Sequence, residues 1–107
     1  MLDLIIKNSK CYINGNLEDK DIAVKDGKIF KIGQISEDAK EVYNAENQIT
    51  LPGCIDTQTH FREPGSTDTE DLHSGSRAAV VGGITAVFEM PNTNPPTSNL
   101  KEFQRKL

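Results

Sequence analysis

The sequence predicts an α/β protein in which a small β unit is followed by the start of a (β/α)8 barrel. Three observations lead to this prediction. Apolar bursts separated by Asn-Gly and Asp-Gly dominate residues 1–51. After Pro52-Gly53, a strand pattern, a helix pattern and a second strand pattern follow in that order. The chain has 107 residues, whereas a closed barrel of this kind needs about 250, so we expect an incomplete barrel.

Composition is typical of a soluble globular protein, with 36% hydrophobic and 26% charged residues. The formal net charge of -4 argues against binding to nucleic acid or to a membrane surface, because such partners select basic patches. No apolar run approaches the roughly 18 residues of a membrane span. The first residues also lack the pattern of a signal peptide. We therefore expect a cytoplasmic protein.

The two cysteines, Cys11 and Cys54, show no CxxC or Cys/His spacing. In a reducing compartment this pattern predicts two buried, reduced thiols. A disulfide or a zinc pair is the alternative.

Residues 1–51 are predicted to form short strands joined by tight turns. Asp26-Gly27 favours a type I′ hairpin between strands at 22–24 and 29–32, because both positions tolerate positive φ. Asn14-Gly15 follows another strand. The other strand candidates are residues 4–6, 11–13, 42–43 and 49–51. The Gly and Asn residues between these bursts argue against an amphipathic helix.

Residues 54–62 are predicted to form the strand that organises the second half. Strand side chains alternate between two faces. One face is therefore expected to carry only polar residues: Asp56, Gln58, His60 and Arg62. Such a face does not belong to an ordinary core, so it contacts solvent or binds a ligand.

The elements that follow complete a βαβ unit. Thr67-Asp-Thr-Glu70 has the spacing of a capping box with Thr67 or Thr69 as N-cap, and predicts a helix over 70–81 that stops at Gly82-Gly83. Residues 84–90 lack strict alternation, which predicts a strand buried on both faces. After the rigid loop 91–96, Ser98 opens a second helix. Strand–helix–strand predicts parallel pairing; a complete small α+β protein is the competing interpretation.

Ligands of parallel α/β folds gather at the carboxyl ends of strands. Neighbouring strands lie roughly 4.8 Å apart. Gln58, His60 and Arg62 are therefore expected to line one opening with Asn92, which follows the next strand. His60 is a candidate metal ligand through a neutral ring nitrogen. Its alternative role is that of a hydrogen-bonded strand residue.

Arg62 offers a planar fork that matches a carboxylate. The alternative is a salt bridge with a nearby acid, and the candidates are Glu63, Asp68 and Glu70. Asn92 could donate its amide to the same ligand, or could simply serve the turn. His73 is expected on the helix surface and is given no role.

Four blocks of sequence together resemble dihydroorotase, a cyclic-amide hydrolase of the amidohydrolase superfamily. They are residues 56–65 (DTQTHFREPG), 74–79 (SGSRAA), 82–85 (GGIT) and 90–95 (MPNTNP). The hairpin around Asp26-Gly27 and the Leu51-Pro-Gly53 turn are also similar to the small β-sandwich that leads into the barrel of that superfamily. This resemblance covers the whole chain. It implies residues 1–51 as part of the sandwich and 52–107 as the first βαβ unit of a TIM-type barrel with the start of its second helix.

The resemblance implies interconversion of N-carbamoyl-L-aspartate and dihydroorotate in pyrimidine synthesis, with one or two zinc ions polarising the ring amide. In the family's His-x-His pattern, His60 matches the second zinc ligand. Gln58 stands where the first histidine is expected, and its amide oxygen is a weaker ligand. Arg62 and Asn92 match the pair that grips the substrate carboxylate. The catalytic base and remaining ligands are expected beyond this chain, which is itself expected to be inactive.

Two alternatives remain open. Gln58 is compatible with a catalytically silent, dihydroorotase-like structural partner of another pyrimidine-pathway enzyme. A hydantoinase- or allantoinase-type cyclic amidase is the other, although those enzymes carry a different residue at the position of Arg62. The expected partner is a small cyclic amide that bears a carboxylate, with no nucleic acid and no membrane. The full-length protein is expected to form a homo-oligomer.

Overall fold

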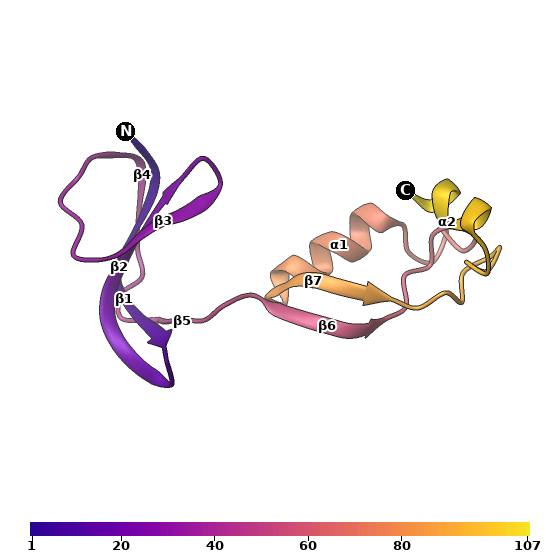
Figure 1. Cartoon of the computed structure of the whole chain (residues 1–107), viewed down its shortest axis with the longest axis horizontal. Coiled ribbons are helices and arrows are strands. Elements are labelled where there is room, and N and C mark those ends of the chain that lie inside the picture. The colour runs from indigo at the N-terminus through magenta and orange to yellow at the C-terminus, as the bar shows by residue number, and fades with distance from the viewer. The chain divides into compact units, whose positions relative to one another are not determined.

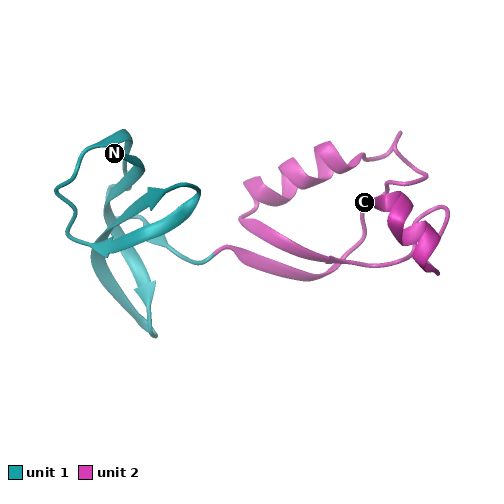
Figure 2. Cartoon of the chain, turned by 45° about the horizontal axis from the view of Figure 1, so that its top comes forward, with its two compact units in different colours: residues 1–52 teal, residues 53–107 magenta.

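The computed structural model describes all 107 residues as a mixed α/β chain made mostly of strands (Figure 1). The chain divides into two compact units, Met1–Pro52 and Gly53–Leu107, hereafter unit 1 and unit 2 (Figure 2). The elements in chain order are β1 (Leu2–Ile13), β2 (Asn16–Lys25), β3 (Lys28–Gly33), β4 (Ala39–Asn44), β5 (Ile49–Thr50), β6 (Cys54–Thr59), α1 (Leu72–Val81), β7 (Ile84–Glu89) and α2 (Leu100–Lys106).

Unit 1 is a five-stranded sheet with the order β3-β2-β1-β4, in which β5 also pairs with β1. β2 is antiparallel to β1 and β3, whereas β4 and β5 run parallel to β1. The predicted hairpin at Asp26-Gly27 is confirmed. Both residues have positive φ, 51° and 70°, and the turn joins the paired residues Lys25 and Lys28.

The first strand differs from the prediction. Residues 4–6 and 11–13 belong to one strand of 12 residues, β1. Its pairing with β2 shifts between Ile6 and Ser9, where Asn8 has a φ of 54°. Asparagine tolerates the left-handed region better than most residues. The polar stretch between the two apolar bursts therefore forms a bulge inside one strand, not a turn between two.

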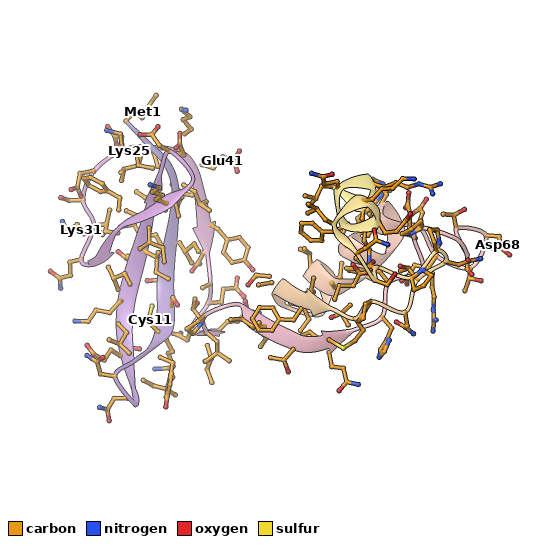
Figure 3. The ribbon with its side chains drawn as sticks, turned by 45° about the vertical axis from the view of Figure 1, so that its right-hand side comes forward. Met1, Cys11, Lys25, Lys31, Glu41 and Asp68 are labelled. Atoms are coloured by element: carbon orange, nitrogen blue, oxygen red, sulfur yellow. The ribbon has the colours of Figure 1, made fainter.

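The hydrophobic core lies in unit 1. Its buried apolar residues are Leu2, Ile5, Cys11, Ile22, Ala23, Ile35 and Ala45. Both cysteines are free, as expected, and Cys11 is buried in the sheet (labelled in Figure 3). Cys54 is exposed, so the prediction that both thiols are buried is wrong for this one. It opens β6, which has a single strand neighbour and therefore little cover.

Unit 2 confirms the predicted βαβ unit, because β6 and β7 pair in parallel and α1 lies between them in sequence and packs against β7 (Figure 1). Helix α1 begins later than predicted. Its N-cap is Asp71, whose Oδ1 accepts the Ser74 N–H at 2.7 Å, while the Ser74 hydroxyl oxygen accepts the Asp71 N–H at 3.2 Å. Neither Thr67 nor Thr69 caps the helix. The helix ends at Val81 before Gly82-Gly83, as predicted.

Two further predictions for unit 2 are corrected. β7 is not buried on both faces: Phe88 is 62% exposed, because β6 is its one strand neighbour. Helix α2 was predicted to open at Ser98 and begins at Leu100, with Asn99 as its N-cap. The Asn99 side chain accepts the Glu102 N–H at 3.1 Å. Neither helix has the length and apolar character that crossing a membrane requires.

Candidate functional site

The strand that carries the predicted site is shorter and less regular than expected. β6 ends at Thr59, three residues before Arg62. Asp56 pairs with Val87 and Thr59 with Glu89, so β6 contains one more residue than β7 over this span. Within it, Asp56 Oδ1 accepts the Gln58 N–H at 2.9 Å, which takes this N–H out of the ladder. The predicted alternation of four polar side chains over residues 54–62 is therefore interrupted at Gln58.

The loops that follow β6 and β7 nevertheless meet. The Met90 N–H donates to Thr59 O at 2.8 Å, and farther out the Asn94 N–H donates to Pro64 O at 3.0 Å. A Cβ on Gly65 would lie 2.6 Å from both Cβ and O of Asn94. These contacts hold the two loops together by their backbones, and glycine is needed at residue 65 for this approach.

His60 and Asn92 are brought into direct contact. His60 Nδ1 lies 2.9 Å from Asn92 Oδ1. Since a carbonyl oxygen can only accept, Nδ1 donates the hydrogen, and in the neutral imidazole Nε2 then keeps its lone pair. Both residues are exposed, so Nε2 of His60 and the NH2 group of Asn92 remain accessible to a ligand. The His60 side chain is therefore hydrogen-bonded, as its alternative role requires. The same hydrogen bond favours the tautomer in which Nε2 can bind a metal ion.

Arg62 lies on the first of these loops, where its carbonyl oxygen accepts the Ser66 N–H at 2.8 Å. Its side chain is exposed and forms no ion pair, so the alternative salt bridge is not observed. Glu63 instead accepts the Leu72 N–H at 2.7 Å, at the start of α1. Asp68 lies farther along the same loop (labelled in Figure 3). The structure thus joins His60 to Asn92 and leaves the Arg62 guanidinium free.

Helix α1 packs against the loop that follows β6. Gly75 is the buried residue of α1, and a Cβ there would lie 2.9 Å from both the Phe61 ring and the Glu70 carboxylate. The Asp71 cap is charged, because hydrogen bonds from the Ser74 backbone and hydroxyl lower the pKa of its carboxyl group. The helix is therefore seated closely against the loop that carries His60 and Arg62.

The donor set fits only part of a zinc site. The chain contains no group of three or more His, Cys, Asp or Glu side chains placed to hold a metal ion. His60 offers one free ring nitrogen, and Gln58 offers an exposed, neutral amide oxygen. A complete tetrahedral site requires further ligands.

The sequence reasoning missed a group of polar residues beside Asn92. The Glu89 and Lys106 side chains form an ion pair of 2.8 Å. Lys106 Nζ also donates to Thr97 Oγ1 at 3.2 Å, and Thr97 Oγ1 lies 3.4 Å from Thr93 Oγ1. The Glu89 carboxylate at the end of the mainly apolar run 84–89 was the one signal in the sequence that could have revealed this group.

Residues 49–107 match the amidohydrolase family. The chain belongs to this family. Among curated members, it is 44% identical over its whole length to a dihydroorotase of Methanosarcina acetivorans, covering 23% of that protein. It is 46% identical to an allantoinase of Escherichia coli over 97% of the chain and 23% of that protein.

A solved structure also resembles this chain in fold. The L-hydantoinase (dihydropyrimidinase) of Arthrobacter aurescens superimposes with a TM-score of 0.88 at 33% identity, over 99% of this chain and 24% of that one. The mixed α/β chain described above therefore resembles the N-terminal part of hydantoinase structures. It spans about a quarter of the length of the relatives that it matches.

Proposed function

We propose that the whole protein to which this chain belongs is a dihydroorotase, which interconverts N-carbamoyl-L-aspartate and dihydroorotate. The observation that carries the proposal is the His60–Asn92 contact at 2.9 Å, which leaves one ring nitrogen and one NH2 group for a ligand. Arg62, two residues farther along the same loop, is exposed and forms no ion pair. Dihydroorotases among the relatives, at 43–44% identity over the whole chain, support it.

Each residue has a role in this proposal. His60 would bind zinc through Nε2 while Asn92 fixes its ring, and Gln58 would be a weak ligand at the neighbouring position. The Arg62 guanidinium and the Asn92 NH2 group would bind the substrate carboxylate. Bound zinc would supply Lewis-acid polarisation of the amide. The base and the remaining ligands would come from outside this chain.

The same proposal extends to the architecture and setting of the protein. Residues 1–51 would belong to a small β-sandwich domain, and residues 52–107 would begin a (β/α)8 barrel. The barrel would bring further strands to β6 and β7. We place the enzyme in pyrimidine synthesis, in the cytoplasm, as a homo-oligomer. The two free cysteines are compatible with a reducing compartment.

Ring closure of N-carbamoyl-L-aspartate by the zinc-supplied whole protein tests this proposal. We expect His60→Ala to abolish turnover, and Arg62→Met to raise KM roughly 100-fold through loss of a charged hydrogen-bonding partner. His73→Ala is the matched control, because His73 is an exposed histidine on α1. Wild-type turnover no faster than that of His60→Ala would refute the proposal.

Gln58 favours a second candidate, a silent structural partner that keeps the fold without catalysis. Glutamine contributes a neutral oxygen where the resemblance places a zinc-binding imidazole. Metal content separates the two: stoichiometric zinc supports the enzyme, and no bound zinc supports the silent partner. In the enzyme, Gln58→His should raise both zinc content and turnover.

The allantoinase and hydantoinase relatives favour a third candidate, a cyclic amidase for another ring. The free guanidinium of Arg62 argues for a substrate that carries a carboxylate. Dihydroorotate carries a carboxylate on its ring, and an unsubstituted hydantoin does not. Equal kcat/KM for the two rings, and no effect of Arg62→Met on either, would favour the third candidate over dihydroorotase.

A further inference from the structure

The loop that carries Asn92 is held by an ion pair outside the candidate site. Glu89 is the last residue of β7 and Lys106 the last of α2, so the pair closes the segment 90–105 between them. Lys106 Nζ lies 2.8 Å from Glu89 Oε2, with the two side chains 12% and 20% exposed. No other ion pair of the chain has both side chains so well covered.

Lys106 is the one charged partner of the Glu89 carboxylate. Glu89 Oε1 is buried and has no hydrogen-bond partner, so Lys106 alone balances the carboxylate. Removing one member of a covered pair leaves the other charge without compensation, which costs far more than losing an exposed pair. We therefore expect removal of either charge to leave the other uncompensated, although the two residues lie 17 residues apart in sequence.

The ion pair continues into the loop through hydroxyl groups. Lys106 Nζ donates to Thr97 Oγ1 at 3.2 Å, and Thr97 Oγ1 lies 3.4 Å from Thr93 Oγ1. Thr93 is only 9% exposed and directly follows Asn92. The Thr97 N–H also donates to Pro91 O at 3.0 Å. The chain on both sides of Asn92 is thus tied to one ammonium group.

We propose that the Glu89–Lys106 ion pair, acting through Thr97 and Thr93, is a positioning device for Asn92. It holds the amide oxygen of Asn92 against His60 Nδ1, so that the NH2 group stays directed to the ligand. Neither charged residue touches the ligand; both act through the loop. The loop-holding role follows from the contacts alone, and its consequence for a substrate carboxylate rests on the proposed function.

Two measurements on the whole protein test this role. The first is hydrogen exchange at the amides of Asn94 and Thr97, both of which are bonded within the two loops. We expect exchange roughly tenfold faster in Lys106→Met and Glu89→Gln, because loss of the covered pair loosens the loop. Lys106→Arg, which keeps the charge, should restore most of the protection. Lys101→Met is the control, an exposed lysine of α2.

The second measurement is steady-state kinetics with N-carbamoyl-L-aspartate. Lys106→Met should raise KM roughly tenfold with a much smaller change in kcat, because the reacting groups remain in place. A defect in general folding would lower the active fraction and leave KM unchanged. Should Lys106→Met fail to fold, Thr97→Val serves instead, since it keeps the ion pair and cuts the link to Thr93.

The outcomes separate the two proposals. An inactive wild-type protein whose loop exchanges faster in the variants would refute the dihydroorotase and retain the positioning role. An active protein whose variants match Lys101→Met in both exchange and KM would overturn the positioning role and leave the enzyme. Faster exchange with unchanged KM would limit the ion pair to holding the loop and would overturn its role for Asn92.

Discussion

The two units are stabilised in different ways. All seven buried apolar residues of the chain lie in unit 1. In unit 2 the buried residues are Gly75 and Thr93, neither of which contributes a large apolar side chain. Unit 2 instead concentrates its specific contacts at the ends of β6 and β7, where backbone bonds and the Glu89–Lys106 pair fix the loops.

The two units also differ in how much apolar side-chain surface they bury. Unit 1 buries a small apolar core, although it also exposes large apolar side chains such as Ile29, Phe30 and Val42 at 66%, 60% and 62%. Unit 2 leaves large apolar side chains in solvent, among them Ile55, Val81 and Phe88 at 58%, 90% and 62% exposure. A two-stranded parallel sheet cannot cover both of its faces. The ordered polar contacts at its strand ends therefore depend on more than the hydrophobic effect within the unit.

Core truncation gives the largest contrast between the units. Ile5 is 1% exposed, so Ile5→Ala should cost roughly 2–5 kcal/mol of unfolding free energy. Phe88→Ala should cost about 0.5 kcal/mol in the 107-residue chain, since its ring is 62% exposed. In the whole protein the same change should cost about 3–5 kcal/mol, if barrel strands cover this ring.

Denaturant unfolding of both variants in both forms of the protein measures these costs. Ile5→Ala is the internal reference, because its neighbours are complete within unit 1. An equally small cost of Phe88→Ala in the chain and in the whole protein would contradict the proposed barrel. It would leave the core of unit 1 as described.

A pair of glycine substitutions gives the next largest effect. A Cβ on Gly27 would meet nothing within 4 Å, so Gly27→Ala should cost about 1 kcal/mol for its φ of +70° and leave KM unchanged. A Cβ on Gly65 would strike Asn94 at 2.6 Å. Gly65→Ala should therefore displace the loop beside Asn92 and raise KM roughly tenfold.

Thermal unfolding and steady-state kinetics on the same preparations distinguish the two glycines. Gly27→Ala controls for the general cost of an alanine at positive φ. If both variants lowered stability alike and neither changed KM, the contact between the loops would have no part in ligand binding.

Sequence reasoning succeeded where local chemistry determines structure. Asp26-Gly27 tolerates the positive φ values of a tight turn, and Gly82-Gly83 is unfavourable within a helix, so both were predicted correctly. The parallel pairing of the strands predicted at 54–62 and 84–90, which the structure shows as the shorter β6 and β7, followed from the order of elements. These features depend on a few neighbouring residues or on the handedness of the crossover.

Sequence reasoning failed where a side-chain contact overrides the regular pattern of strand alternation or helix capping. Asp56 captures the Gln58 N–H, which interrupts the alternation on which the four-residue polar face was based. Asp71 caps α1 in place of the threonines, because its carboxylate accepts the Ser74 N–H. The Glu89–Lys106 pair joins residues far apart in sequence, and no local spacing encodes it. The His60–Asn92 contact was anticipated only as proximity.

Acid sensitivity gives the smallest contrast, and again the units differ. In unit 1 three carboxyl groups have pKa values below their usual range: Asp3, Asp21 and Glu37. The ammonium group of Lys40 is the main cause for Asp3. In unit 2 the pKa of the Asp71 carboxyl group is lowered by hydrogen bonds from Ser74. A carboxylate with a lowered folded pKa stabilises the protein above its unfolded pKa, and this contribution is lost as the pH falls through the folded value.

Unit 1 should therefore lose more stability than unit 2 between about pH 5 and pH 2. Both tyrosines lie in unit 1 and both helices in unit 2, so tyrosine fluorescence and helical circular dichroism follow the units separately. Asp3→Asn should flatten the pH dependence of the fluorescence transition only, and Asp71→Asn that of the helical transition only. Asparagine is suitable at residue 71 because it still caps a helix without the charge. Transitions that shift equally with pH in both signals would show that acid acts on the whole chain and not through these particular hydrogen bonds.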